Sequence, residues 1–358
     1  MYSTEQWVLN PLPPKEDLET KSILKSLPGA HAALAELKGV AASIPNQSIL
    51  INMLGLIEAK GSSEIENIIT THDELYKSEL NSFGSIAAKE VQNYVAALRK
   101  GYELVLSSGL LSNKTILTIH DTLEKNNAGF RKLPGTVLTN SKTNEIVYTP
   151  PQNYVEIENL MSNLEKFINE NELTSFDPLV KMAIIHYQFE SIHPFYDGNG
   201  RTGRIMNILY LIINKLQTLP ILYLSSYIIK NKSKYYELLQ DVRDRENWEE
   251  WLLFMIQGVE ETARETIELI NQIKSLMMDY KQRLRGNYKF YSQDLLNNLF
   301  KHPYTKIEFI EKDLGVSRIT AAAYLNRLAK DGVLRKEKHG TGNYYINEPL
   351  INLFSKRQ

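Results

Sequence analysis

Apolar residues recur at spacings of three and four through most of this chain, as in helices that bury one face. The pattern is clear between Ala32 and Lys100, where Met53, Leu54 and Ile57 fall on one such face. It returns over residues 155–168, 177–189, 200–215, 225–241 and 248–280. We therefore expect a mainly α protein whose body is a bundle of helices.

Two segments depart from the helical spacing. Residues 1 to about 30 contain four prolines, the last of them Pro28, and predict an extended arm on the surface. Residues 129–151 alternate β-branched and polar side chains around a Ser-Lys-Thr-Asn turn at residues 141–144. This second segment predicts an isolated β-hairpin.

The pattern changes again after about Leu296, to short helices and a terminal hairpin. Ser317 is a good N-cap for the helix that runs to Ala329, and a basic hairpin follows over residues 334–346. The segment 296–358 has more basic than acidic residues and resembles a winged helix-turn-helix domain. Such a domain can bind DNA, with its second helix in the major groove, or serve as a surface for dimerisation or target docking.

Composition narrows the classes of function. The chain has 41 basic and 42 acidic side chains, so its overall charge does not attract nucleic acid or anionic lipid. It has no cysteine, which excludes disulfides, thiolate metal sites and cysteine nucleophiles. The N-terminus lacks a secretory signal, and polar residues interrupt the apolar tract Ile205–Ile229. We expect a soluble cytoplasmic protein with no membrane partner.

The segment HPFYDGNGRTGR, residues 193–204, has the features of a phosphate site. Backbone N–H groups of Gly198, Asn199 and Gly200 can converge at the start of a helix, and the Asn199 side chain adds a donor. Arg201 and Arg204 follow on one helical face, which suits a di- or triphosphate.

Two further residues of the same loop suggest catalysis. Asp197 offers a hard oxygen ligand for Mg²⁺ directly before the glycines. His193, four residues earlier, has an ordinary pKa of about 6.5 and can accept a proton near neutrality. A proton acceptor, a metal ligand and phosphate donors therefore occur together.

The string resembles the signature of Fic-domain proteins, H-P-F-x-[D/E]-G-N-G-R-x-x-R, at every defining position. The resemblance implies an all-α core whose motif loop joins two central helices, with the hairpin at residues 129–151 as a flap. It also implies a protein adenylyltransferase that uses ATP and Mg²⁺. His193 would be the base for a Ser, Thr or Tyr hydroxyl, Arg201 would bind the leaving pyrophosphate, and Arg204 would bind the γ-phosphate. A protein target would add a strand to the flap.

The segment GSSEIENIIT resembles the inhibitory motif of the same family, [S/T]-x-x-x-E-[G/N]. Ser62 and Glu66 are four residues apart and share a helical face, with Asn67 beside them. The resemblance implies that Glu66 pairs with Arg204 and keeps the γ-phosphate out of its productive position. It also leaves open a reverse reaction, in which Glu66 positions water to remove AMP.

The adenosine end of the site is indicated by position and family analogy alone. Asn207 lies one turn beyond Arg204 and is a candidate for the ribose, while Tyr235 or Tyr236 could stack on adenine. The full set of expected ATP-binding residues is Glu66, His193, Gly198, Asn199, Gly200, Arg201, Thr202, Gly203, Arg204, Asn207, Tyr235 and Tyr236.

These expectations divide the chain into four parts. They are an arm with the inhibitory helix (1–105), the Fic catalytic core (106–255), a connecting helix (256–295) and the winged-helix-like domain (296–358). One alternative is a DNA-binding regulator that only senses ATP. Another is a Fic enzyme that transfers phosphocholine, UMP or phosphate, although Gly200 stands where the kinase-like branch has lysine. The resemblance also leaves a homodimer open.

Overall fold

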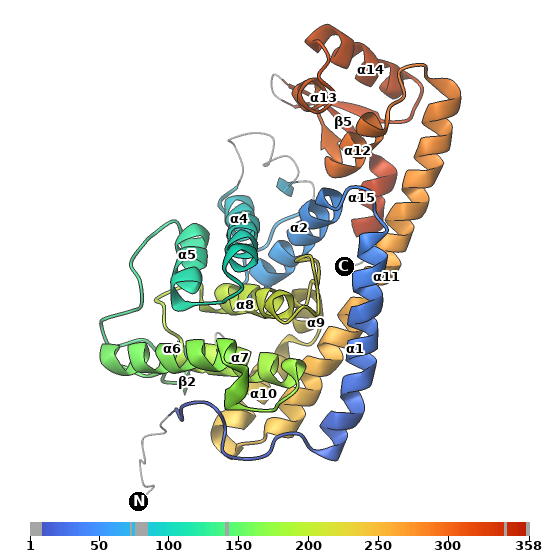
Figure 1. Ribbon diagram of the computed structural model, residues 1–358. Helices are drawn as coiled ribbons and strands as arrows, with labels where there is room; N and C mark the ends of the chain where they lie inside the picture. Colours follow the sequence, from blue (N-terminus) through green and yellow to red (C-terminus); the bar gives the residue numbers. More distant parts are fainter. Residues whose placement is uncertain (1–8, 72–73, 76–84, 140–142, 340–341, 356–358) are drawn as a thin grey trace, which may run out of the picture.

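The computed structural model describes residues 9–71, 74–75, 85–139, 143–339 and 342–355. A helical body and a smaller C-terminal domain lie at the two ends of one long helix (Figure 1). This helix, α11 (Trp248–Asn287), has 40 residues, and α1 (Lys21–Ala42) packs along it. None of the helices within the described ranges is both long enough and apolar enough to cross a bilayer.

The centre of the body is the pair α7 (Pro178–Ile192) and α8 (Asn199–Ile213). Every residue of α7 after Pro178 is buried, including polar side chains such as His186 and Glu190. The pair is surrounded by α2 (Ser48–Ile65), α4 (Ile86–Ser108), α5 (Asn113–Glu124) and α6 (Tyr154–Asn169), with the short η1 (Asn171–Leu173) after α6. The loop between α7 and α8 is therefore held on a rigid core.

The N-terminal segment differs from the extended arm that its prolines predict. Residues 1–8 lie outside the described part of the chain, but α1 begins at Lys21 and includes Pro28. A proline inside a helix costs about 3 kcal/mol. Burial of Ile23, Leu27 and Leu34 against the core offsets that cost, at roughly 1.5–3 kcal/mol for each large side chain.

The helix expected over residues 225–241 is two helices, α9 (Ser225–Lys230) and α10 (Lys232–Arg245). They meet at Asn231, whose side-chain amide donates to the Tyr227 carbonyl at 3.0 Å. Its backbone N–H also bonds the carbonyls of Tyr227 and Ile228, so the last turn of α9 is satisfied locally. The apolar tract 205–229 is divided in the same way, because α8 ends at Ile213 and α9 begins at Ser225.

The expected hairpin is present but its paired part is short. Strands β1 (Leu138–Thr139) and β2 (Ile146–Tyr148) are antiparallel, with Leu138 opposite Tyr148 and an irregular register after it. The Ser-Lys part of the predicted turn falls in residues 140–142, outside the described residues.

The C-terminal domain contains short helices and a small sheet. Its elements are α12 (Gln293–Lys301), β3 (Tyr304–Thr305), α13 (Ile307–Leu314), α14 (Arg318–Lys330), β4 (Arg335–His339), β5 (Gly342–Ile346) and α15 (Glu348–Ser355). The strands pair in the order β3–β5–β4, and Ser317 caps α14 as expected. The fold class predicted from the sequence, a mainly helical core with a hairpin and a small C-terminal domain, is confirmed.

Candidate active site

The loop that joins α7 to α8 has a fixed and unusual backbone. His193 follows the last residue of α7 in the left-handed region, with φ of 49°, and Gly198 precedes α8 with φ of 74°. A residue other than glycine in such a conformation costs of order 1–3 kcal/mol and persists only where neighbours hold it. Figure 1 shows the two helices that this loop joins, α7 in green and α8 in yellow-green.

Asn199 supplies part of that support. Its side-chain oxygen accepts from the Phe195 N–H at 2.9 Å, and its amide donates to the Phe195 carbonyl at 2.8 Å. Both polar atoms of the Asn199 side chain thus bond within the loop, while one of the two N–H groups of its amide is left for another acceptor. The expectation that this side chain is a phosphate donor stays a prediction. The backbone N–H of Asn199 still belongs to the nest at the start of α8.

His120, on α5, is a support that the sequence analysis missed. Its ring stacks on Phe195 with centroids 3.7 Å apart, and its Nε2 lies 3.0 Å from the Asp197 carbonyl oxygen. Burial lowers the pKa of His120, so the ring is neutral and can donate from Nε2. A lone histidine on a helix 73 residues before the motif gives no signal of this role in the sequence.

Arg204 lies inside the protein, 2% exposed, and is bound to the end of α2. Its Nε donates to the Ser62 hydroxyl at 2.7 Å, and its Nη2 donates to the Ser62 carbonyl at 2.9 Å and to Glu66 Oε1 at 2.8 Å. Burial opposes the charge on both partners, yet their pairing dominates, lowering the pKa of Glu66 and raising that of Arg204.

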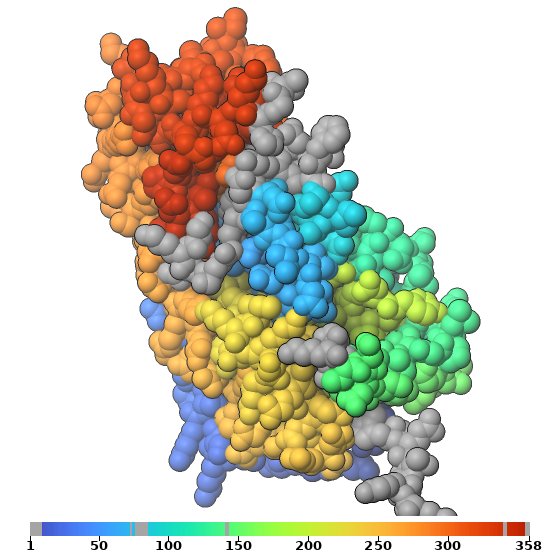
Figure 2. Space-filling view, turned by 180° about the vertical axis from the view of Figure 1, so that it is seen from behind, coloured from blue at the N-terminus to red at the C-terminus, as the bar shows by residue number. Residues whose placement is uncertain are grey.

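Glu66 itself lies over the start of α8. A Cβ on Gly200 would overlap Glu66 Oε1, so the carboxylate occupies the space that the glycine leaves open. Glu66 is the residue after α2 rather than inside the helix, and Asn67 follows with φ of 62°. The Asn67 side chain accepts from Lys232 of α10 at 3.2 Å, and Figure 2 shows this light-blue end of α2 against the yellow surface of α9 and α10.

Arg201 is also held by carboxylates, which the sequence analysis did not predict. Its Nη2 donates to Glu124 of α5 at 2.9 Å and its Nη1 to Glu90 of α4 at 3.0 Å. Glu124 Oε1 also lies where a Cβ on Gly198 would be. The two glycines of the nest are thus each covered by a carboxylate, and each carboxylate binds one of the two motif arginines.

His193 has the properties of a proton acceptor. Burial lowers its pKa to about 4, and the positive charges of Arg131 and Arg243 act in the same direction. The imidazole is therefore neutral at pH 7 and can take a proton without first losing one. Neither arginine was among the residues expected from the sequence.

Asp197 is an exposed carboxylate beside the nest, and its Oδ1 accepts from the Gly198 N–H at 2.7 Å. No group of three or more metal-ligating side chains occurs within the ranges that the structure covers. The single carboxylate of Asp197 fits Mg²⁺, because Mg²⁺ is commonly held by one or two carboxylates together with substrate phosphates and water.

The remaining expected residues are mostly buried. Asn207 and Tyr235 meet on His186, whose Nδ1 lies 3.1 Å from the Asn207 amide and whose Nε2 lies 2.8 Å from the Tyr235 hydroxyl. Both are at most 2% exposed, whereas Tyr236 is 45% exposed at the edge of the site. Thr202 is fully buried, and Gly203 packs against Glu190 and Phe189 of α7.

Comparison with known proteins gives three matches along the chain. The family models described as Fic/DOC family N-terminal, Fic/DOC family, and protein adenylyltransferase SoFic-like C-terminal domain match residues 24–103, 110–211 and 276–350. The chain belongs to the Fic/DOC family. The central match includes the whole segment from His193 to Arg204.

Among curated relatives, a probable protein adenylyltransferase of Aquifex aeolicus is 32% identical over 191 residues, 51% of this chain and 53% of that protein. The protein adenylyltransferase Fic of Aedes aegypti is 32% identical over 81 residues, 23% of this chain and 15% of that protein. The chain thus spans about half the length of the first relative, and far less of the second.

Solved structures support the fold. A crystal structure of a Fic family protein from Desulfovibrio desulfuricans G20 has a TM-score of 0.59 at 21% identity, covering 94% of this chain and 98% of that one. Fic-1 from C. elegans has a TM-score of 0.55 at 20% identity, covering 70% of this chain and 73% of that one.

Proposed function

We propose that this Fic/DOC protein transfers AMP from ATP to a hydroxyl group of a protein, including its own. The observation that carries the proposal is a neutral histidine, His193, on the loop that leads into α8, whose first turns bring backbone N–H groups and two arginines. The names of the curated relatives point to the same activity.

The reaction follows from these residues. His193 takes the proton of a Ser, Thr or Tyr hydroxyl, whose oxygen attacks the α-phosphorus of ATP. The bond from that phosphorus to the bridging oxygen breaks, and pyrophosphate leaves with the electron pair. N–H groups at the start of α8 and the Arg201 guanidinium stabilise the negative charge that develops. Asp197 would hold Mg²⁺, which neutralises phosphate charge when bound.

The contact between Arg204 and Glu66 supports autoinhibition. Ser62 and Glu66 bind the Nε and Nη2 donors of Arg204 and so compete with a γ-phosphate for this guanidinium. The Glu66 carboxylate also repels phosphate from the start of α8, where it overlaps the free space above Gly200. We propose that ATP binds in a non-productive position until Glu66 moves, and that a resident Glu66 could position water for AMP removal.

The hairpin supports a protein target. Val137, Ile146 and Val147 of the segment 129–151 are at least 39% exposed, although apolar side chains normally favour burial. A target strand that pairs with this flap would cover them and bring its hydroxyl to the loop. We propose that backbone pairing, rather than side-chain sequence, aligns the target.

The proposal is tested by labelling from ATP that carries radioactive phosphorus at the α position. Glu66→Gly should label itself at least about tenfold faster than the wild type, because Arg204 is released. The double variant Glu66→Gly/His193→Ala should lose that labelling by a factor of about 10² or more. Absence of label in Glu66→Gly, at a thermal unfolding midpoint like that of the wild type, would contradict the proposal.

A further inference from the structure

Arg131 lies after α5, within the flap segment 129–151, and has no exposed surface. A buried arginine is stabilised by hydrogen bonds to its donors, and here Nε and Nη2 donate to backbone carbonyls while Nη1 has no hydrogen-bond partner. Its Nε donates to the His193 carbonyl at 2.8 Å, and its Nη2 donates to the carbonyls of Pro151 and, at 3.4 Å, Ile192. Its backbone N–H bonds the Pro194 carbonyl at 2.8 Å.

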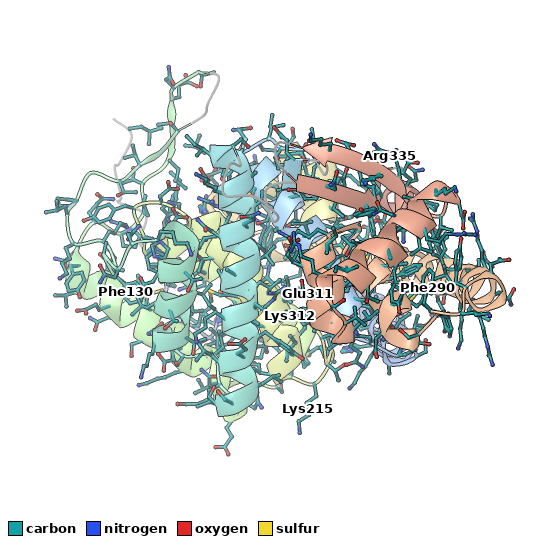
Figure 3. The ribbon with its side chains drawn as sticks, turned by 90° about the horizontal axis from the view of Figure 1, so that it is seen from above. Phe130, Lys215, Phe290, Glu311, Lys312 and Arg335 are labelled. Atoms are coloured by element: carbon teal, nitrogen blue, oxygen red, sulfur yellow. The ribbon has the colours of Figure 1, made fainter. Side chains whose placement is uncertain are left out.

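These contacts join two parts of the site that the chain itself keeps apart. Arg131 stands near the N-terminal end of the flap segment and Pro151 at its C-terminal end, while residues 192–194 belong to the loop that carries the proposed base. One side chain therefore fastens both ends of the flap to that loop. Figure 3 shows Phe130, its neighbour in sequence, on the flap side of α4, away from the C-terminal hairpin and Arg335.

A second contact fixes the flap from the other side. The Tyr148 hydroxyl of β2 donates to the Ser191 carbonyl at 2.7 Å, and the Arg243 guanidinium of α10 lies 3.9 Å from the centre of the Tyr148 ring. Because this contact ties the flap to α7 independently, loss of Arg131 should loosen the flap without detaching it.

We propose that Arg131 is a positioning residue for group transfer: it holds the flap and the His193 loop in one arrangement, so that a hydroxyl aligned by the flap meets the imidazole. The inference rests on the proposed function, AMP transfer to a protein hydroxyl. It assigns Arg131 no contact with ATP. A displacement of about 1 Å between reacting groups can cost a factor of about 10² in rate.

The charge of Arg131 adds a measurable signature. Burial is the main cause of the low pKa of His193, and the positive charges of Arg131 and Arg243 lower it further. Glu66 and the Glu190 carbonyl raise the pKa of His193. Removing the Arg131 charge should raise the pKa of His193 from about 4 toward the ordinary value. The protonated, inactive fraction then grows in mildly acidic solution, and the acidic limb of the rate profile moves to higher pH.

The test compares Arg131→Met and Arg131→Lys in the active Glu66→Gly chain, with self-labelling by α-labelled ATP as the readout. Arg131→Met should lower the limiting rate at saturating ATP by at least about tenfold, with the KM for ATP within about twofold of the parent. Arg131→Lys should give an intermediate rate, because an ammonium can bind some of the same carbonyls. Lys114→Met, which removes an exposed charge from α5 outside the flap segment, should match the parent.

The pH dependence distinguishes positioning from a general loss of structure. The ratio of the rates at about pH 5.5 and pH 7.5 should fall in Arg131→Met and stay at the parent value in Arg131→Lys, which keeps the charge. A limiting rate for Arg131→Met equal to the parent would overturn the inference. The inference would also be overturned if the KM for ATP of Arg131→Met rose as its limiting rate fell, and if the limiting rate of Arg131→Lys were no higher than that of Arg131→Met.

Misfolding of Arg131→Met and failure of the proposed function can each be told apart from failure of this inference. If Arg131→Met does not fold, Arg131→Lys decides alone: a lower limiting rate at unchanged KM supports positioning, and a parental rate overturns it. Labelling of the Glu66→Gly parent is measured in the same experiment. Its failure would count against the proposed function, whereas failure of the Arg131 variants to differ from a labelled parent would count only against this inference.

Discussion

Ser62 is fully buried at the end of α2, and its hydroxyl accepts from Arg204 Nε at 2.7 Å. At the scale of single residues, the inhibited state depends on this bond as well as on the ion pair to Glu66. A buried donor that loses its partner costs about 1–3 kcal/mol. Loss of the Ser62 hydroxyl would therefore destabilise the inhibited arrangement, in which Arg204 is kept away from phosphate.

We therefore predict that Ser62→Ala partly activates the protein. Its rate of self-labelling from α-labelled ATP should lie above the wild type and below Glu66→Gly, because the Glu66 ion pair remains. Ser63→Ala is a matched control, since Ser63 is equally buried on the neighbouring position and makes no described bond to Arg204. A Ser62→Ala rate no higher than that of the wild type would show that the hydroxyl does not contribute.

Glu124 leads to a second prediction at this scale. Its carboxylate is 14% exposed, binds Arg201 and lies over Gly198, where a phosphate oxygen would approach the nest. In the Glu66→Gly chain, Glu124→Gln should lower the KM for ATP by roughly two- to tenfold, because one like charge is removed from the phosphate site.

Glu90→Gln is the control for that measurement. Glu90 binds the same guanidinium at a similar distance, but its side chain is 33% exposed and it does not cover a glycine of the nest. Glu90→Gln should therefore change the KM for ATP less than Glu124→Gln does. If Glu124→Gln instead raised the KM for ATP, Glu124 would be orienting Arg201 for the phosphate rather than competing with it.

At the scale of elements, the site depends on how closely the helices approach one another. Gly101 of α4 faces α8 and α5, where a Cβ would lie 2.6 Å from Leu209 Cδ1 and 2.9 Å from Ile119 Cδ1. Gly39, on the exposed side of α1, has nothing within 4 Å of the same position. The two glycines are thus a matched pair with opposite surroundings.

We predict that Gly101→Ala lowers the free energy of unfolding by about 1–3 kcal/mol, because the added methyl group overpacks the core. Gly39→Ala should raise it by roughly 0.5–1 kcal/mol, since alanine loses less entropy than glycine in a helix. Denaturant unfolding of both variants checks the pair. Equal changes in the same direction would contradict the packing described for α4, α5 and α8.

The elements also show what could be predicted from the sequence. Helical spacing identified most of the helices, and the residues from His193 to Arg204 identified the phosphate loop because they are contiguous. His120, Glu124 and Arg131 reach that loop from α5 and the flap, more than 60 residues earlier. Periodicity indicates which residues of a helix are buried, but not which neighbour they face, so these partners could not be predicted.

At the scale of the whole molecule, the C-terminal domain is fixed to the helical body. The Tyr280 hydroxyl of α11 lies 3.1 Å from the Val333 carbonyl and 2.9 Å from Asn347 Oδ1, and α15 returns to pack on α11. The two arginines of α14 are in ion pairs, Arg318 with Glu308 at 2.9 Å and Arg327 with Asp331 at 2.7 Å.

Because these cations already have carboxylate partners, we predict that the full chain does not retard a short DNA duplex at about 150 mM salt. A gel-shift titration measures this, with the same duplex at about 20 mM salt to reveal weak charge-driven binding. Salt-sensitive binding with a dissociation constant below about 1 µM at the higher salt would instead favour the DNA-binding regulator.

AMP transfer at this loop, restrained by Glu66, can be tested in one experiment. The most direct measurement incubates Glu66→Gly and the wild type with ATP labelled either at the α- or at the γ-phosphorus, and follows label retained by the protein. We predict strong retention of α-label by Glu66→Gly, weak retention by the wild type, and no γ-label on either. Retention of γ-label would identify phosphate as the transferred group and contradict the account, as would equal α-labelling of the two proteins.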